Sequence, residues 1–188
     1  MLEHPVIITR RRTSRITIRI SKDGEVRVSA PRLVPKPVIE RFIESQRDWI
    51  EKNLAKAEAR QAGREAFYSK LDISTAAARK KAVAQLRAIV SPLIEKYSAE
   101  MGVEPAGISF RATKTRWGSC NPKTRQINLS LYLLLLPQRC IEHIVVHELA
   151  HLLVPNHGPR FYAVMDKHFS DWKQVRKETS KLVISGNI

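Results

Sequence analysis

Residues 138–162 read QRCIEHIVVHELAHLLVPNHGPRFY and carry four of the six histidines of the chain. Their apolar side chains recur with the 3.6-residue period of a helix, which predicts a helix from about Gln138 to Val154. The recurring positions are Ile141, Ile144, Val145, Leu149 and Leu152. His147 and His151 are four residues apart, so both imidazoles lie on one face of this helix and can reach one metal ion.

A general base and a third ligand complete the expected metal site. Glu148 follows His147 and is rotated about 100° around the helix axis, so it projects beside the metal, where a base can take a proton from a metal-activated water. Pro155 interrupts the helical bonding, and the turn it favours can bring His157 back to the ion. A catalytic zinc ion keeps three protein ligands and one open position. The spacing therefore predicts one Zn²⁺ per chain, held by His147, His151 and His157.

Other interpretations of these histidines remain open at this point. A short H-E-x-x-H match occurs by chance in many proteins, so the periodic helix and the third histidine carry the prediction. His143 also lies four residues before His147, but that pair would have no acid or base between its members. A structural zinc site usually has four ligands and is rich in cysteine, whereas neither Cys120 nor Cys140 belongs to a C-x-x-C pair. Cys120 could still reach the zinc ion as an inhibitory ligand.

The composition bounds the class of protein. A chain of 188 residues, 43% of them apolar, suits one domain, or a small module joined to a larger one, with a real core. It contains no run of about 18 or more apolar residues, so a membrane span is not expected. The N-terminal residues are basic without a following apolar segment, and there are only two cysteines. A cytoplasmic, reducing location with free thiols is therefore expected.

The net charge of +15 raises the question of nucleic-acid binding. The excess of Lys and Arg lies in residues 1–125 and nearly vanishes around the histidines. Aromatic residues do not interleave the basic ones, as a base-stacking platform would require. A nucleic-acid partner is possible but not favoured, and a solvated basic surface is the preferred explanation of the charge.

Residues 1–70 are predicted to form an N-terminal module. Within residues 5–31, apolar and polar side chains alternate on both sides of a turn at residues 22–24, which indicates a β-hairpin. Apolar residues then recur at a 3.6-residue period over residues 38–54, which predicts a helix. Residues 55–70 are polar and Ala-rich and are expected to be the tail of that helix and a linker.

Residues 71–188 are predicted to form the metal-dependent hydrolase domain. The expected elements are, in order, a helix from an N-cap at Ser74 to about Met101, two strands within residues 107–130 around a turn at 121–124, the histidine helix, and helices around residues 161–169 and from about Ser170. Pro92 removes one backbone hydrogen bond and is expected to kink or split the first of these helices.

Three blocks in order resemble a known family. Residues 115–120 read TRWGSC, the histidine helix follows, and residues 156–162 read NHGPRFY. This combination resembles the YgjP-type metallopeptidases, bacterial and archaeal zincin-like proteins related to the SprT-like proteases. The histidine spacing also matches the metzincins, but Val154 occupies the position of a glycine in their pattern and no Met-turn sequence follows. The YgjP-type resemblance extends over nearly the whole chain and implies the same ligands, His147, His151 and His157, with Glu148 as acid and base.

Four further residues are candidates for substrate binding. Arg116, Trp117 and Gly118 are expected on a strand or its turn beside the histidine helix, where an edge strand of a zincin can pair with an extended peptide. The alternative is that Trp117 packs in the core and Gly118 serves a bulge. Tyr162 could donate a hydrogen bond to the oxyanion of a tetrahedral intermediate, or serve in packing.

The sequence therefore predicts an α+β fold, in which a zincin-like domain packs its active-site helix on a small mixed or antiparallel sheet after a β-rich N-terminal module. The predicted function is a zinc-dependent metallopeptidase that hydrolyses amide bonds of peptides or proteins through a metal-activated water. Two alternatives remain. One is a DNA-associated SprT-like protease recruited by its basic surface, and the other is a zinc-binding interaction module without catalysis.

Overall fold

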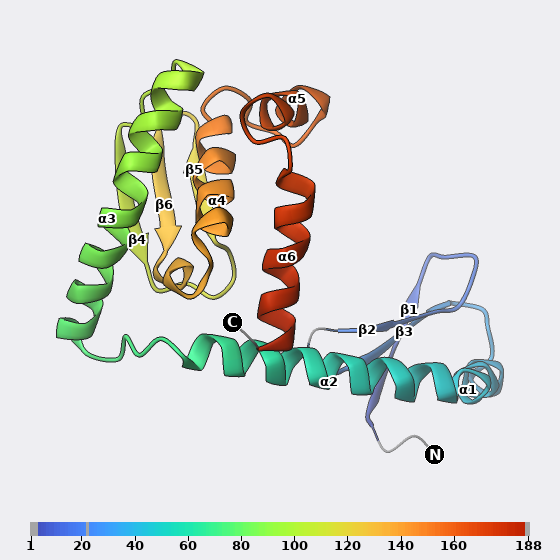
Figure 1. Ribbon diagram of the computed structural model, residues 1–188. Coiled ribbons are helices and arrows are strands. Elements are labelled where there is room, and N and C mark those ends of the chain that lie inside the picture. The colour runs from blue at the N-terminus through green and yellow to red at the C-terminus, as the bar shows by residue number, and fades with distance from the viewer. Residues whose placement is uncertain (1–3, 22, 187–188) are drawn as a thin grey trace. The chain divides into compact units, whose positions relative to one another are not determined.

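The computed structural model describes residues 4–21 and 23–186, and these divide into two compact units, Met1–Glu65 and Ala66–Ile188 (Figure 1). Each unit has its own core of buried apolar side chains. Among the described residues, no helix is long and apolar enough to cross a membrane. The predicted division into domains after residue 70 stays a prediction, because it requires that each part fold by itself.

The first unit contains a three-stranded sheet in the order β1-β3-β2. β3 (Val26–Pro31) pairs antiparallel with β2 (Thr17–Ile20), which confirms the predicted hairpin. β1 (Val6–Arg11) pairs with the other edge of β3, in parallel. Of the predicted turn at 22–24, Lys22 lies outside the described residues, and Gly24 has a φ of 78°, a conformation that glycine adopts without strain.

The helical part of this unit differs from the prediction. One helix was expected over residues 38–54, but α1 (Lys36–Ser45) ends and α2 (Arg47–Ser69) begins around Gln46. Gln46 has φ −106° and ψ 13°, and its N–H bonds the carbonyl of Ile43, three residues back, so the i to i−4 ladder is interrupted there. The linker predicted within residues 55–70 is also wrong, since α2 continues to Ser69.

After the last turn of α2, the second unit continues with α3 (Ala76–Met101), which runs through Pro92 as one helix. Of the kink or split predicted at Pro92, the split is wrong. A proline removes only one hydrogen bond, and the buried side chains on both sides of it hold the helix in the core. These are Ala82, Leu86, Val90, Leu93, Tyr97 and Met101. The N-cap is Thr75 rather than Ser74, and its hydroxyl accepts a hydrogen bond from the N–H of Ala78.

A second three-stranded sheet lies against the helices of this unit. Its order is β4-β6-β5, with β4 (Gly107–Arg111) parallel to β6 (Gln126–Ser130) and β5 (Gly118–Asn121) antiparallel to it. The turn at 121–124 and the strand that follows it are confirmed, but two strands, β4 and β5, precede the turn where one was predicted. The sheet is mixed. β5 is an edge strand, paired on one side only.

The histidine helix is α4 (Gln138–Ala150), which follows a 3-10 helix, η1 (Leu131–Leu135). α4 ends four residues before the predicted end at Val154. Pro155 follows Val154 and disfavours helical geometry at Val154. The chain therefore leaves α4 through a hydrogen-bonded turn.

α4 contacts α3, β5, α5 (Pro159–His168) and α6 (Trp172–Ser185), so it is surrounded by the other elements of its unit (Figure 1). Its most deeply buried side chains are apolar, with Val146, Leu149 and Ala150 at 0% exposure. The predicted α+β fold, with the histidine helix packed on a small sheet and a β-rich N-terminal part, is confirmed. This surrounding core fixes the direction of the polar side chains that α4 carries.

Candidate metal centre and catalytic site

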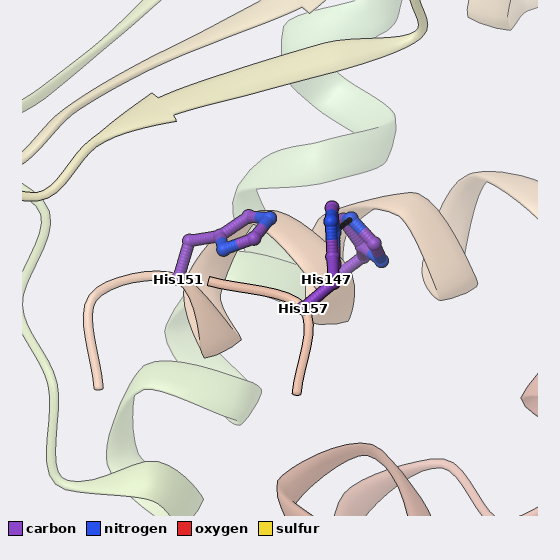
Figure 2. A group of neighbouring side chains, drawn as sticks. All are labelled: His147, His151 and His157. Carbon is purple, nitrogen blue, oxygen red and sulfur yellow. Dashed lines mark hydrogen bonds between the residues drawn. The ribbon is translucent and has the colours of Figure 1, made fainter. Parts of the chain in front are cut away.

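Three histidines converge where α4 ends (Figure 2). One ring nitrogen from each of His147, His151 and His157 lies within 4.8 Å of the others, and the Nε2 atoms of His147 and His157 are 3.0 Å apart. In a tetrahedral zinc site with Zn–N bonds of about 2.0–2.1 Å, ligand nitrogens are about 3.3–3.4 Å apart. Three imidazoles at this spacing could hold one divalent metal ion.

The turn after α4 brings the third histidine back. His151 is the residue that caps α4, and its φ of −67° and ψ of −19° keep the helical spacing from His147. The Val154 carbonyl accepts a hydrogen bond from Nδ1 of His151, at 3.2 Å. That bond fixes the tautomer and leaves Nε2 of His151 free to coordinate a metal. The chain then turns at Asn156, whose carbonyl accepts a hydrogen bond from the N–H of Gly158 at 2.9 Å. This turn returns His157 to the cluster.

One buried phenyl ring supports all three imidazoles. Phe161, in the first turn of α5, is 1% exposed, and its ring centroid lies 4.9, 4.6 and 4.7 Å from those of His147, His151 and His157. Packing of this kind fixes the rotamers of ligand side chains before any ion arrives. The helical period predicted Phe161 only as a core residue, because its contact with all three rings depends on the turn between α4 and α5.

The lowered pKa values of His147 and His151 favour neutral imidazoles, which can bind a cation. Burial, and then the neighbouring His151 and His157, lower the pKa of His147 to about 3. Burial also lowers the pKa of His151. A metal ligand must present an unprotonated nitrogen. The donor set therefore fits a divalent metal ion at neutral pH.

Glu148 lies next to the ligand His147 in the chain and is buried. It is 5% exposed, and its Oε2 atom has no hydrogen-bond partner among the residues that the structure describes. Burial raises the pKa of Glu148 to about 8, and the positive charge of Arg116 opposes that shift. A buried carboxyl without a partner costs stability, which is typical of a functional group and not of a structural one.

A cavity of about 320 Å³ opens over Glu148 and the metal cluster. Of the residues predicted to bind substrate, Trp117, Gly118 and Tyr162 line it, whereas Arg116 does not. Arg116 is exposed and acts on Glu148 through its charge. Trp117 lines the cavity, and its ring also packs against Phe67, at 6.2 Å between centroids. Its role in substrate binding stays a prediction. The stacking of Tyr162 on Trp172, at 5.0 Å and 8°, makes this part of the wall rigid.

Four other residues of the cavity wall were not predicted as site residues. His143, Ile144, Trp172 and Arg176 line the cavity with Glu148. The helical period places His143 one turn before His147, so its position on the same face was visible in the sequence. Trp172 and Arg176 come from α6, and their spacing in the sequence does not link them to the histidines, because only tertiary packing brings α6 against α4.

Cys120 does not belong to the cluster of donors among the described residues. It is a free thiol, partly buried on β5, as Cys140 is a free thiol in α4. Burial, and then the charge of Glu148, raise the pKa of the Cys120 thiol to about 11. The thiol form at neutral pH is a poor metal ligand, so the inhibitory role considered for Cys120 has no support.

Comparison with known proteins gives one family and two structural similarities. A family model described as YgjP-like, metallopeptidase domain matches residues 14–74 and 70–181. No curated protein sequence matches the chain. Two solved structures resemble part of it. The metallopeptidase zymogen abylysin of Pyrococcus abyssi has a TM-score of 0.47 and 22% identity, over 53% of this chain and 99% of that one. The metallopeptidase zymogen jannalysin of Methanocaldococcus jannaschii has a TM-score of 0.46 and 19% identity, over 50% of this chain and 97% of that one. Similarities of this size carry no conclusion about the chain.

Proposed function

Because this chain belongs to the YgjP-like metallopeptidase family, we propose that it is a zinc-dependent peptidase whose metal is held by His147, His151 and His157 and whose general base is Glu148. Membership confirms the family predicted from the three sequence blocks. It makes the chain a metal-dependent protease that acts on peptide or protein substrates. The ligand set, the identity of the metal and the catalytic residue are the steps that go beyond the family.

The single observation that carries this proposal is that the buried Glu148 lines the same cavity as His147 and His157. When bound, zinc would polarise the scissile carbonyl and lower the pKa of a coordinated water. A cation among the histidines favours the ionised form of Glu148, the form that accepts a proton. Glu148 takes a proton from the attacking water and later delivers it to the nitrogen of the leaving amine. Its burial away from bulk water keeps that proton at the site.

The edge of β5 is suited to bind the peptide backbone. Along an antiparallel pair of strands, residues that form hydrogen bonds to the partner strand alternate with residues that do not. The carbonyl of Trp117 accepts a hydrogen bond from the N–H of Ser130 at 2.8 Å, so the next residue along β5 does not bond to β6. The backbone groups of Gly118 and Cys120 therefore point away from β6, toward the open edge. An extended substrate that pairs with this edge would place its scissile bond beside Glu148, which touches Gly118. Tyr162 would then form the opposite wall, against a substrate side chain.

Two alternatives receive less support. A zinc-binding module without catalysis would have no use for a buried, unpartnered Glu148 beside the ligands. A DNA-associated protease rests on the net charge of +15 alone. Binding of double-stranded DNA that weakens steeply with salt would favour that alternative.

The decisive experiment compares Glu148→Gln with wild type for metal content and for digestion of a peptide library read by mass spectrometry. Glu148→Gln should keep its zinc and lose roughly 100- to 10,000-fold in turnover, the share of catalysis that a positioned base supplies. Glu95→Gln, an exposed carboxylate on α3, is the control and should behave as wild type. His151→Ala should lose zinc. Unchanged turnover in Glu148→Gln, or unchanged zinc in His151→Ala, would contradict the proposal.

A further inference from the structure

α6 has one apolar face and one basic face. Its buried residues are Trp172, Val175, Thr179 and Val183. Between them, at spacings of three and four residues, lie Lys173, Arg176, Lys177, Ser180 and Lys181, all exposed. Residues at these spacings share one face of a helix. The basic side chains are therefore gathered along one exposed stripe of α6.

This basic stripe lines a groove. The groove has a volume of about 460 Å³ and is lined by Trp172, Lys173, Arg176, Lys177, Ser180 and Lys181. Trp172 and Arg176 also line the cavity above Glu148. Because the two depressions share these two residues, the groove continues outward from the proposed catalytic site.

The charge of the groove is of one sign. No carboxylate lines it, and none of its four basic side chains forms an ion pair with any residue in the described part of the chain. Glu178, on the same helix, accepts a hydrogen bond from Gln174 at 2.9 Å and is not part of the lining. Like charges this close repel one another and attract an anionic partner.

We propose that the groove of α6 binds an acidic segment of the peptide substrate, so that the enzyme prefers peptides with Asp or Glu on one side of the scissile bond. The proposal rests on the proposed function, because it assumes that a peptide lies in the cavity above Glu148. Arg176 stands at the junction and is in reach of the acidic side chain nearest to that bond. The lysines that follow along α6 would meet successive carboxylates.

The aromatic residue of the groove favours a peptide over a single-stranded nucleic acid. Single-strand binding sites combine basic residues with exposed aromatic rings on which bases stack. Trp172 is 7% exposed, its ring is stacked on Tyr162, and its Nε1–H donates to Asp166 at 2.8 Å. It therefore offers no free face to a base, and the recognition that the groove can provide is electrostatic.

The test measures binding with the full chain loaded with zinc. Glu148→Gln is the background, because it leaves the peptide intact. A short fluorescein-labelled peptide with a run of glutamates is titrated by fluorescence anisotropy at low salt, beside the same peptide with glutamines. The groove variant adds Lys173→Gln, Lys177→Gln and Lys181→Gln. The acidic peptide should bind the background protein about tenfold more tightly than the neutral one, and the groove variant should lose that preference.

A matched variant separates the groove from total charge. Lys80→Gln, Lys81→Gln and Lys123→Gln remove the same number of exposed lysines outside the groove, and this control should keep the preference. Equal binding of the two peptides, or equal loss in both triple variants, would overturn the proposal. So would single-stranded DNA that binds more tightly than the acidic peptide and depends on the same lysines. If the acidic peptide binds selectively but the wild-type protein hydrolyses no peptide, the proposed function is contradicted and the proposal for the groove is not.

Discussion

Gly118 lies directly against the side chain of Glu148. A β-carbon at position 118 would be 2.5 Å from Oε1, 2.6 Å from Cγ and 2.7 Å from Cδ of Glu148. Real β-carbons do not approach other atoms this closely. β5 can therefore approach α4, and the open edge of β5 can reach the proposed base, only because residue 118 has no side chain. This contact accounts for the glycine in the TRWGSC block without any appeal to a turn or a bulge.

Gly118→Ala should lower kcat/KM by roughly 100-fold, because the methyl group must displace the carboxyl of Glu148, and a shift of about 1 Å at a catalytic group costs about that much. Zinc content should stay at the wild-type level, since the atoms nearest to a β-carbon at residue 118 belong to Glu148 and not to a histidine. Gly107→Ala is the control. Its β-carbon would meet only the amide end of the Gln126 side chain, which can swing aside. Wild-type activity in Gly118→Ala would show that the contact has no role in positioning Glu148.

Removal of the metal should destabilise the protein. Three imidazole nitrogens within 4.8 Å are held together in the folded chain only, so an ion bound there stabilises that state by about 2.7 kcal/mol at a free concentration 100 times its Kd. For a chain of this size, a chelator should then lower the Tm by about 5–10 °C, measured by scanning calorimetry. His157→Ala should abolish the difference between the chelated and zinc-loaded protein. His168→Ala, outside the cluster, should retain it. An unaltered Tm after complete chelation would contradict the assignment.

His143 should make the protein sensitive to acid. It is 6% exposed, and neither ring nitrogen has a partner among the described residues. Burial, and then the charge of Arg176, lower the pKa of His143 from 6.5 to about 4. Below pH 6.5 the unfolded chain binds a proton that the folded chain does not, so the stability present above pH 6.5 is lost as the pH falls toward 4.

The corresponding variant is His143→Leu, of similar volume and without the unpartnered nitrogens. Urea unfolding of the metal-free protein at pH 7 and pH 5 should show a smaller loss of stability in His143→Leu than in wild type. The difference should be at most about 1.4 kcal/mol per pH unit. At pH 7 the variant should be at least as stable as wild type, because removal of an unsatisfied buried polar group is favourable. Identical pH dependence would show that His143 gains its proton without unfolding.

Cys120 should react slowly with alkylating reagents. The thiolate is the nucleophile, and a thiol with a pKa of about 11 is almost entirely protonated at pH 8. Iodoacetamide should therefore modify Cys120 roughly 100-fold more slowly than an unperturbed thiol, as followed by peptide mapping. The denatured chain is the control and should react at the ordinary rate. Fast modification of the folded protein would mean that Cys120 is more exposed or more acidic than its place on β5 indicates.

Helix periodicity and local chemistry explain which elements the sequence predicted well. β4, β6 and the histidine helix repeat an apolar pattern along their length, so burial and local geometry agree there. The predictions that failed concern helix continuity. Gln46 interrupts what looked like one helix, whereas Pro92 does not interrupt another. In both cases packing against the rest of the unit decides whether one backbone hydrogen bond can be lost, and that packing is not local.

By itself, the sequence determined the histidine spacing on one helix face, the acidic residue beside it and the family blocks on either side. These are local properties, because residues one to four positions apart on a helix have fixed relative directions. The tertiary structure alone decided what surrounds them. The support of the imidazoles by Phe161, the contact of Gly118 with Glu148 and the approach of α6 to the cavity beside α4 each join segments distant in sequence. Such contacts are set by how the elements share one core, which no local pattern of residues encodes.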